Sequence, residues 1–274
     1  ILQSLDKLLS LKVGGVSASL DMLICFLLTI QDASISTKAT KLLRWRDSSV
    51  PELETFIWDL IPCLMESGDN IHISNGYILW LRYLTNFSSK QLTSEILNHK
   101  LQKGQYWRYI QNGMGSTVHE HRKYCLSILK LSIQQLDIDV DNEFMYYNKE
   151  SSPQILEEWK KYCTLFEIVG IDTALNQAEA AKSDIHQLLS PDSFVKSSWG
   201  MVLLSTGFKG SMESVRKFSL NIMLSCSVDR LPIYAHEYLT SVFLRYAVEA
   251  PHFLVKKTNN KLICEYGLRL ENFI

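Results

Sequence analysis

The sequence predicts an all-α protein built from stacked antiparallel helix pairs. Apolar residues recur at helical spacing along nearly the whole chain, and no segment alternates long enough with period two to indicate a strand. Glycine and proline, which supply the tight turns of sheets, make up only 18 of 274 residues. Similar helical segments also recur at separations typical of helical repeats. These three observations together favour long helices joined by short turns.

The first helices are predicted from apolar spacing and from turn residues. Apolar residues between 20 and 28 follow the i, i+3, i+4, i+7 pattern of one helix face. A helix with a basic end covers residues 42–46, and Asp47-Ser48-Ser49 followed by Pro51 is typical of the start of the next one. Residues 67–70 break the chain before a helix over 77–84.

The later helices follow the same logic. Residues 112–116, which contain two glycines, predict a turn, and residues 121–136 predict a helix. Ser151-Ser152-Pro153 predicts another helix start. The remaining predicted segments are a helix over 172–189, a helix over 194–204 that begins after Ser190–Ser193 and ends near Gly207 and Gly210, and helices over 214–226 and 232–248. We expect roughly 11 to 13 helices, too many for one bundle core.

Self-similarity refines the fold class. The segment Arg122–Leu129 matches Arg216–Met223 in residue type, at an offset of 94 residues or twice 47. HEAT and armadillo repeats are about 40–47 residues long, so we expect residues 1–274 to form a single HEAT/armadillo-like α-solenoid region. Arg122 and Arg216 stand where such repeats carry an arginine. They either brace the neighbouring repeat or contact a ligand.

Composition excludes several classes of protein. The chain has 28 Lys and Arg against 29 Asp and Glu, so its net charge of −1 excludes a globally basic nucleic-acid binder but allows a local basic surface. The apolar run Met22–Ile30 is shorter than the ~20 residues that span a bilayer, so we expect no membrane association.

The cysteines indicate the compartment. None of the six belongs to a CxxC pair, so we expect free, buried thiols and a cytoplasmic location. They are Cys25, Cys63, Cys125, Cys163, Cys226 and Cys264.

Motifs for catalysis and metal binding are missing. The cluster Gly113-Met114-Gly115 lacks the spacing of a phosphate loop, and no GxSxG motif occurs. His119 and His121 are two residues apart, whereas the two histidines of the zinc-binding HExxH motif are four residues apart on one helix face. Cys163 and His186 have no feature that links them as nucleophile and base. We therefore predict no catalytic, cofactor-binding or metal-binding residue in this chain, and an all-helical enzyme is the least favoured interpretation.

The segment from residue 100 to residue 130 is basic, with Glu120 as its single acid. Tyr106, Trp107 and Tyr109 are interleaved with the cations, and cations beside stacking rings are what RNA binding requires. The alternative is a solvated helix face whose aromatic residues belong to the core. The candidate RNA-binding residues are Lys100, Lys103, Arg108, Arg122, Lys123 and Lys130, with a second cluster at Lys256 and Lys257.

Three segments between residues 120 and 225 carry a family resemblance: residues 157–167, residues 194–204 and the repeat at 215–218. Together they resemble the N-terminal helical-repeat region of the eukaryotic tRNA guanosine-18 2′-O-ribose methyltransferases, the family that includes the TAR RNA-binding protein. The resemblance implies tRNA as the substrate and an S-adenosylmethionine-dependent, SPOUT-type catalytic domain C-terminal to this chain. None of that domain is found in these residues, so no catalytic residue is carried over.

The chain begins at Ile1 and ends at Ile274 inside an apolar pattern, so we expect it to be a piece of a larger protein. The resulting hypothesis is a non-catalytic RNA-binding region that positions tRNA for the catalytic domain of the same protein. The competing hypothesis is a HEAT-like scaffold for protein partners, with no role in RNA binding.

Overall fold

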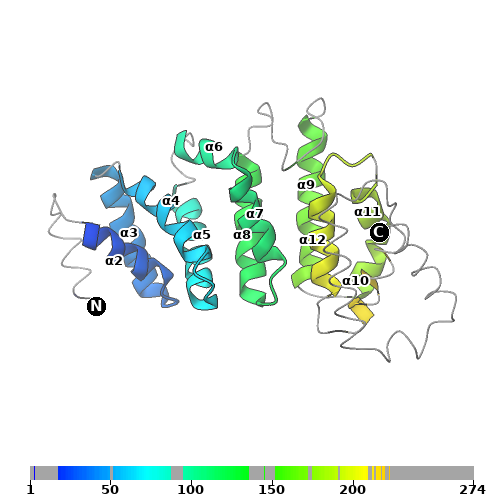
Figure 1. The fold of residues 1–274 in the computed structure, drawn as a ribbon, viewed down its shortest axis with the longest axis horizontal. Coiled ribbons are helices and arrows are strands. Elements are labelled where there is room, and N and C mark those ends of the chain that lie inside the picture. The colour runs from blue at the N-terminus through cyan, green and yellow to red at the C-terminus, as the bar shows by residue number, and fades with distance from the viewer. Residues whose placement is uncertain are drawn as a thin grey trace. The chain divides into compact units, whose positions relative to one another are not determined.

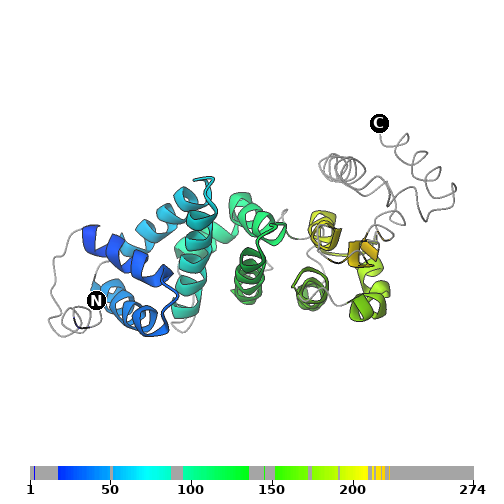
Figure 2. The ribbon, with the colours of Figure 1, turned by 90° about the horizontal axis from the view of Figure 1, so that it is seen from below.

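A computed structural model describes residues 18–49, 52–87, 95–135, 152–171, 175–190 and 192–208, with residues 3, 145, 212, 214–216, 218–219 and 222. All the secondary-structure elements of these residues are helices, which confirms the all-α fold class (Figures 1 and 2). The chain divides into two compact units. Unit 1 contains residues 1–113 and 118–140, and unit 2 contains residues 114–117 and 141–274.

Unit 1 is built from consecutive helices, and two of them, α3 and α5, begin at an aspartate side chain that caps the helix. Asp32 Oδ1 accepts hydrogen bonds from the backbone N–H groups of Ser34 and Ile35, at 2.9 and 3.0 Å. Asp69 Oδ1 does the same for Ile71 N at 2.8 Å, directly after Gly68, whose φ of +75° confirms the predicted break. The helices of this unit are α2 (Ala18–Thr29), α3 (Ala33–Ser49), α4 (Glu52–Met65), α5 (Asn70–Phe87), α6 (Glu95–Leu101), α7 (Gly104–Met114) and α8 (His119–Gln135).

Unit 2 begins its main helix at the predicted Ser-Pro start. Its elements are α9 (Ser152–Phe166), a π-helical turn η1 (Glu167–Ile171), α10 (Leu175–Ala180), α11 (Lys182–Leu188) and α12 (Ser197–Phe208). The Tyr162 hydroxyl donates to the Trp199 carbonyl at 2.8 Å and so ties α9 to α12. The Trp159 and Trp199 rings meet edge to face with centroids 5.0 Å apart, which is a favourable aromatic geometry.

The core of unit 1 is an aromatic cluster shared by α4, α5 and α7. Trp80 and Tyr106 lie edge to face with ring centroids 4.6 Å apart, and Trp58 contacts both. Trp107 contacts Tyr106 and donates its Nε1–H to the Leu101 carbonyl at 2.7 Å, which fastens the end of α6 to α7. Large rings from three helices therefore meet in one place, and burial of their apolar area stabilises the packing.

The seam between α7 and α8 is antiparallel. Near the start of α7, the Tyr106 hydroxyl lies 2.6 Å from Ser132 Oγ, late in α8. Near the end of α7, Gly113 lies against Cys125, seven residues earlier in α8. Because seven residues make two helical turns, one face of each helix forms the seam.

Two predictions about helix ends are corrected, and one is confirmed. Residues 112–114, predicted as a turn, continue α7, because Gly113 gives α8 and Tyr77 room to approach. The helix predicted from residue 194 begins at Ser197, since the Phe194 and Val195 amides donate to the Glu158 carboxylate instead. The predicted end of this helix is confirmed, since α12 ends at Phe208, directly after Gly207, which lies against Val169 and Ser219.

The cysteine prediction holds for three residues and fails for one. Cys25, Cys125 and Cys163 are free and buried, whereas Cys63 is exposed. Burial raises the pKa of the Cys25 thiol to about 12, so this thiol is protonated and inert at neutral pH. Cys226 and Cys264 lie outside the described residues. No helix in the described part of the chain has the length and apolarity that crossing a bilayer requires.

Gly113→Ala should destabilise the protein although alanine favours helices by about 1 kcal/mol. A Cβ at this position would overlap Cys125 Sγ and the Tyr77 hydroxyl, and overpacking of a core costs about 1–3 kcal/mol. Urea unfolding followed by circular dichroism measures the change.

The matched control for this prediction is Asn112→Ala, on the exposed side of the same helix, which should be neutral or slightly stabilising. Adding Cys125→Ala to Gly113→Ala should restore part of the lost stability, because it removes the sulfur that the new methyl group meets. A Gly113→Ala protein as stable as the wild type would contradict the close approach of α7 and α8.

His121 should make the stability of the protein depend on pH. Its Nε2 lies 2.6 Å from Ser74 Oγ and its ring packs on Tyr77, which joins α8 to α5. Burial lowers the pKa of His121 below its usual value, so the unfolded chain binds the proton more tightly. Stability should therefore fall as the pH drops from above about 6.5 towards the folded-state pKa. Urea unfolding at several pH values should show a weaker dependence in His121→Gln, and identical curves would refute this role.

Candidate nucleic-acid interface

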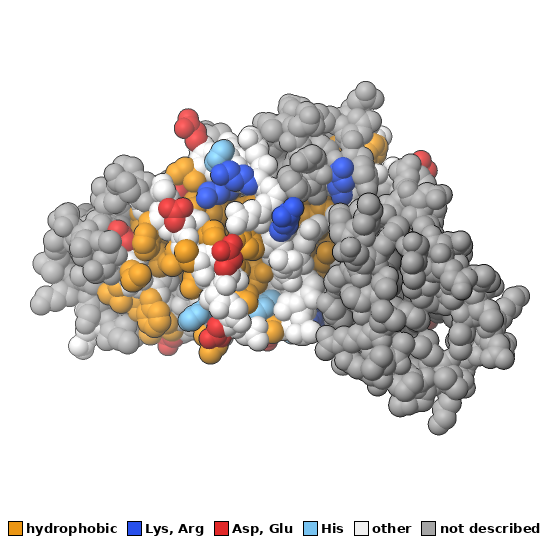
Figure 3. All heavy atoms as spheres, in the orientation of Figure 1, with side chains coloured by type: hydrophobic (Ala, Val, Ile, Leu, Met, Phe, Trp, Pro, Cys, Tyr) orange, Lys and Arg blue, Asp and Glu red, His pale blue; other side chains and the backbone are white. Residues whose placement is uncertain are grey.

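Lys100 and Lys103 lie together at the turn from α6 to α7. The Lys103 amide donates to the Lys100 carbonyl at 2.9 Å, and the Tyr106 amide donates to the Lys103 carbonyl at 3.1 Å. Lys100 stands in the last turn of α6, where a cation interacts favourably with the helix dipole. Lys103 is exposed and Lys100 half-buried. On the face seen in Figure 3, Lys and Arg side chains gather where Figure 1 places α6.

The remaining exposed candidate cations lie on opposite sides of the α7–α8 seam. Arg108 is on the outer side of α7, and Lys123 and Lys130 are on the outer side of α8. Arg108 is two residues beyond Tyr106, which is about 200° of helix rotation from the contact with α8. Lys123 and Lys130 each stand two residues before a seam residue of α8, so they point away from α7 by the same geometry. The candidate cations of unit 1 therefore do not form one continuous strip. We treat them as two sets: Lys100, Lys103 and Arg108 of α6, the turn and α7, and Lys123 and Lys130 of α8.

Arg122 differs from the other candidates because it is half-buried. Its guanidinium lies 3.2 Å from His119 Nδ1, one turn earlier on α8. Burial lowers the pKa of Arg122, and the nearby Glu120 carboxylate opposes this shift. A guanidinium held in this way is less free to reach a ligand than the exposed ammonium group of Lys123 on the same helix. Both roles considered for it, bracing and ligand contact, stay open.

The aromatic residues of the basic segment belong to the core. Tyr106 and Trp107 are only 4% and 1% exposed, so neither can stack on a base, and for these two rings the alternative of a core position is confirmed. Their burial follows from α7 itself, because they occupy the face that meets Trp80 and the end of α6. Tyr109 remains half-buried.

A carboxylate from outside residues 100–130 lies beside this basic segment, and the count of acidic residues within the segment did not include it. Glu66, at the end of α4, accepts hydrogen bonds from the Tyr109 hydroxyl and, at 3.4 Å, from Gln105 Nε2. Burial and the hydrogen bond to Glu66 raise the pKa of Tyr109 to about 12. Counting charges between residues 100 and 130 could not reveal Glu66, because it comes from another helix.

Lys256 and Lys257, the second predicted cluster, lie outside the described residues. Within the described ranges, no group of three or more His, Cys, Asp or Glu side chains is arranged to hold a metal ion.

Tyr106→Phe should lower stability without a direct effect on nucleic-acid binding. The variant loses the hydrogen bond to Ser132 Oγ, which contributes about 1 kcal/mol, and the ring stays in the core. Thermal unfolding and RNA filter binding on the same preparation separate the two effects. A large loss of RNA affinity by a variant that is still folded at the assay temperature would contradict the core position of this ring.

Comparison with known proteins identifies the family. No family model matches the chain, and no solved structure matches it significantly. The chain is 35% identical over 283 aligned residues to the tRNA (guanosine(18)-2′-O)-methyltransferase of Saccharomyces cerevisiae. The alignment covers 96% of this chain but only 18% of the yeast protein, so the chain spans less than a fifth of that relative. The resemblance predicted from the sequence is therefore confirmed: the chain belongs to the family of this tRNA (guanosine(18)-2′-O)-methyltransferase, and corresponds to its N-terminal region.

Proposed function

We propose that this chain is a non-catalytic, cytoplasmic RNA-binding region of a tRNA 2′-O-ribose methyltransferase. In this proposal it holds tRNA for a SPOUT-type catalytic domain of the same protein that lies C-terminal to it. The observation that carries the proposal is the 35% identity along 96% of the chain to a protein named for that reaction. Helix pairs stacked as a HEAT-like solenoid would suit the role, since they offer an extended surface.

The exposed cations suggest how the region would hold RNA. Lys103, Arg108, Lys123 and Lys130 are exposed, whereas Tyr106 and Trp107 are buried. Recognition of unpaired bases needs exposed stacking rings, but recognition of a folded RNA can rest on phosphate and ribose contacts. The proposed contacts are therefore to the tRNA backbone, through whichever of the two cation sets faces it.

The glycine cluster that begins at Gly113 does not fit S-adenosylmethionine, the cofactor that the family implies. The best glycine cluster of the chain begins at Gly113, which is buried in α7 against Cys125 and Tyr77 and cannot form a cofactor loop. The proposal therefore assigns the cofactor to the domain outside this chain, and no residue here is given a role in methyl transfer.

Binding of unmodified tRNA should weaken steeply with salt, because each phosphate contact releases counterions. Filter binding between about 50 and about 200 mM salt should give a log–log slope of about −0.7 to −0.9 per contacted phosphate. Two charge-reversal variants identify the contacting set: Lys100→Glu/Lys103→Glu/Arg108→Glu and Lys123→Glu/Lys130→Glu. The variant of the contacting set should bind at least about tenfold more weakly and show a smaller slope.

The matched control is Lys182→Glu, an exposed lysine of α11 in unit 2, which should bind tRNA like the wild type. Circular dichroism verifies that each variant is folded. Salt-independent binding, or equal affinity in both charge-reversal variants and the wild type, would refute the proposed RNA contacts. Methyl transfer by this chain alone would refute its non-catalytic role.

A further inference from the structure

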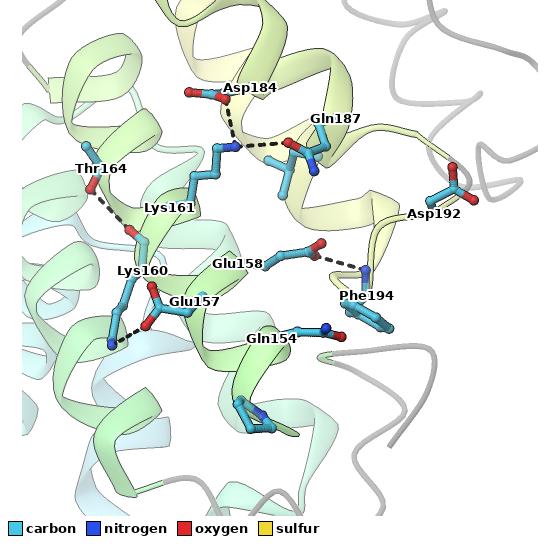
Figure 4. Close-up of a pocket in the computed structure, with 12 residues that line it drawn as sticks. Gln154, Glu157, Glu158, Lys160, Lys161, Thr164, Asp184, Gln187, Asp192 and Phe194 are labelled. Carbon is cyan, nitrogen blue, oxygen red and sulfur yellow. Dashed lines mark hydrogen bonds and ion pairs between the residues drawn. The ribbon is translucent and has the colours of Figure 1, made fainter. Parts of the chain in front are cut away.

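Unit 2 contains a groove whose chemistry differs from that of the cations of unit 1. It lies between α9, α11 and the segment 192–194, and has a volume of about 730 Å³. This is within the range of ligand-binding clefts. Figure 4 shows Gln154, Glu158 and Lys161 of α9 on one side, with Asp184 and Gln187 of α11 and Asp192 and Phe194 around them. We call it the α9–α11 groove.

The groove carries an excess of negative charge. Four carboxylates line it, from Glu157, Glu158, Asp184 and Asp192, against two ammonium groups. Both lysines already have a carboxylate partner, since Lys160 Nζ lies 2.7 Å from Glu157 and Lys161 Nζ lies 2.7 Å from Asp184. Among the described residues, the charges of Glu158 and Asp192 have no cationic partner, so the groove they line repels phosphate and attracts cations.

Glu158 is held in place by the segment opposite it. Its Oε2 accepts hydrogen bonds from Phe194 N at 2.9 Å, Ser193 Oγ at 3.1 Å and Val195 N at 3.3 Å. Within the described residues, Oε1 of the same carboxylate accepts none. One oxygen thus fixes the position of the group, and the other remains available to a donor from outside.

Asp192 and the apolar residues complete the site. The Asp192 amide donates to Ser190 Oγ, while its exposed carboxylate forms no hydrogen bond or ion pair with described residues. Phe194 and Leu188 supply apolar surface on the same groove. Lysine and arginine side chains combine an apolar stem with a charged end, so the stem can pack on such surface while the cation meets the carboxylates.

We propose that the α9–α11 groove binds a lysine- or arginine-containing segment of a protein partner. The charge of the groove selects a basic peptide over RNA, and the fixed Glu158 carboxylate gives the cation a preorganised acceptor. The proposal does not depend on the RNA-binding role of unit 1.

Fluorescence anisotropy with the 274-residue chain tests the proposal, with a short fluorescein-labelled Arg–Gly peptide as the probe. The peptide should bind saturably, and matched Glu–Gly and Gln–Gly peptides should not. Asp192→Asn, which breaks no described contact, should weaken binding about three- to fivefold, the effect of one exposed ion pair. Glu158→Gln/Asp192→Asn should weaken it about tenfold, since the glutamine keeps an acceptor for the 193–195 segment.

The matched control is Glu179→Gln, an exposed carboxylate of α10 in the same unit but outside the groove, which should bind the peptide like the wild type. A photo-crosslinking residue at Gln154 should capture the peptide, and one at the exposed Gln177 of α10 should not. Equal weakening by Glu179→Gln, absence of saturable binding, or displacement of the peptide by oligoadenylate at the groove would overturn the proposal. None of these outcomes alters the test of tRNA binding, which uses other residues.

Discussion

The packing of α7 against α8 decides what the basic segment can do. Tyr106 meets Ser132 and Gly113 meets Cys125, so one face of each helix is committed to the seam. The same contacts turn the rings of Tyr106 and Trp107 into the core and leave Arg108 on one outer side, Lys123 and Lys130 on the other. At position 113 this packing accepts only glycine, because any larger side chain would push the helices apart.

The two units differ in the chemistry of their surfaces. Unit 1 exposes cations at the α6–α7 turn and along α8, with Glu66 and Glu120 among them. Unit 2 contains a groove with two carboxylates in excess, organised around Glu158. A net charge of −1 thus averages surfaces of opposite sign. The two proposals assign RNA to one unit and a basic protein segment to the other, and each is tested separately.

Much of the fold could be predicted from local signals. Apolar spacing, the break before Asp69 and the Ser-Pro start of α9 each act within a few residues, so the sequence alone contains the information. The predictions failed where a distant group intervened. The Phe194 and Val195 amides, which local logic assigned to a helix, donate to Glu158, more than thirty residues earlier. Gly113 lies inside α7 because neighbouring side chains need the space that its missing side chain leaves.

The sequence by itself determined the helical class, the position of most helices, the family and the list of cations, because these follow from composition, periodicity and local similarity. Only the tertiary structure decided which rings are accessible, which side of the seam each cation occupies, and which carboxylates lie together. The physical reason is that burial and electrostatic environment are set by contacts between helices. Glu66 beside Tyr109, and Asp184 and Asp192 beside Glu158, come from separate elements whose proximity no local pattern records.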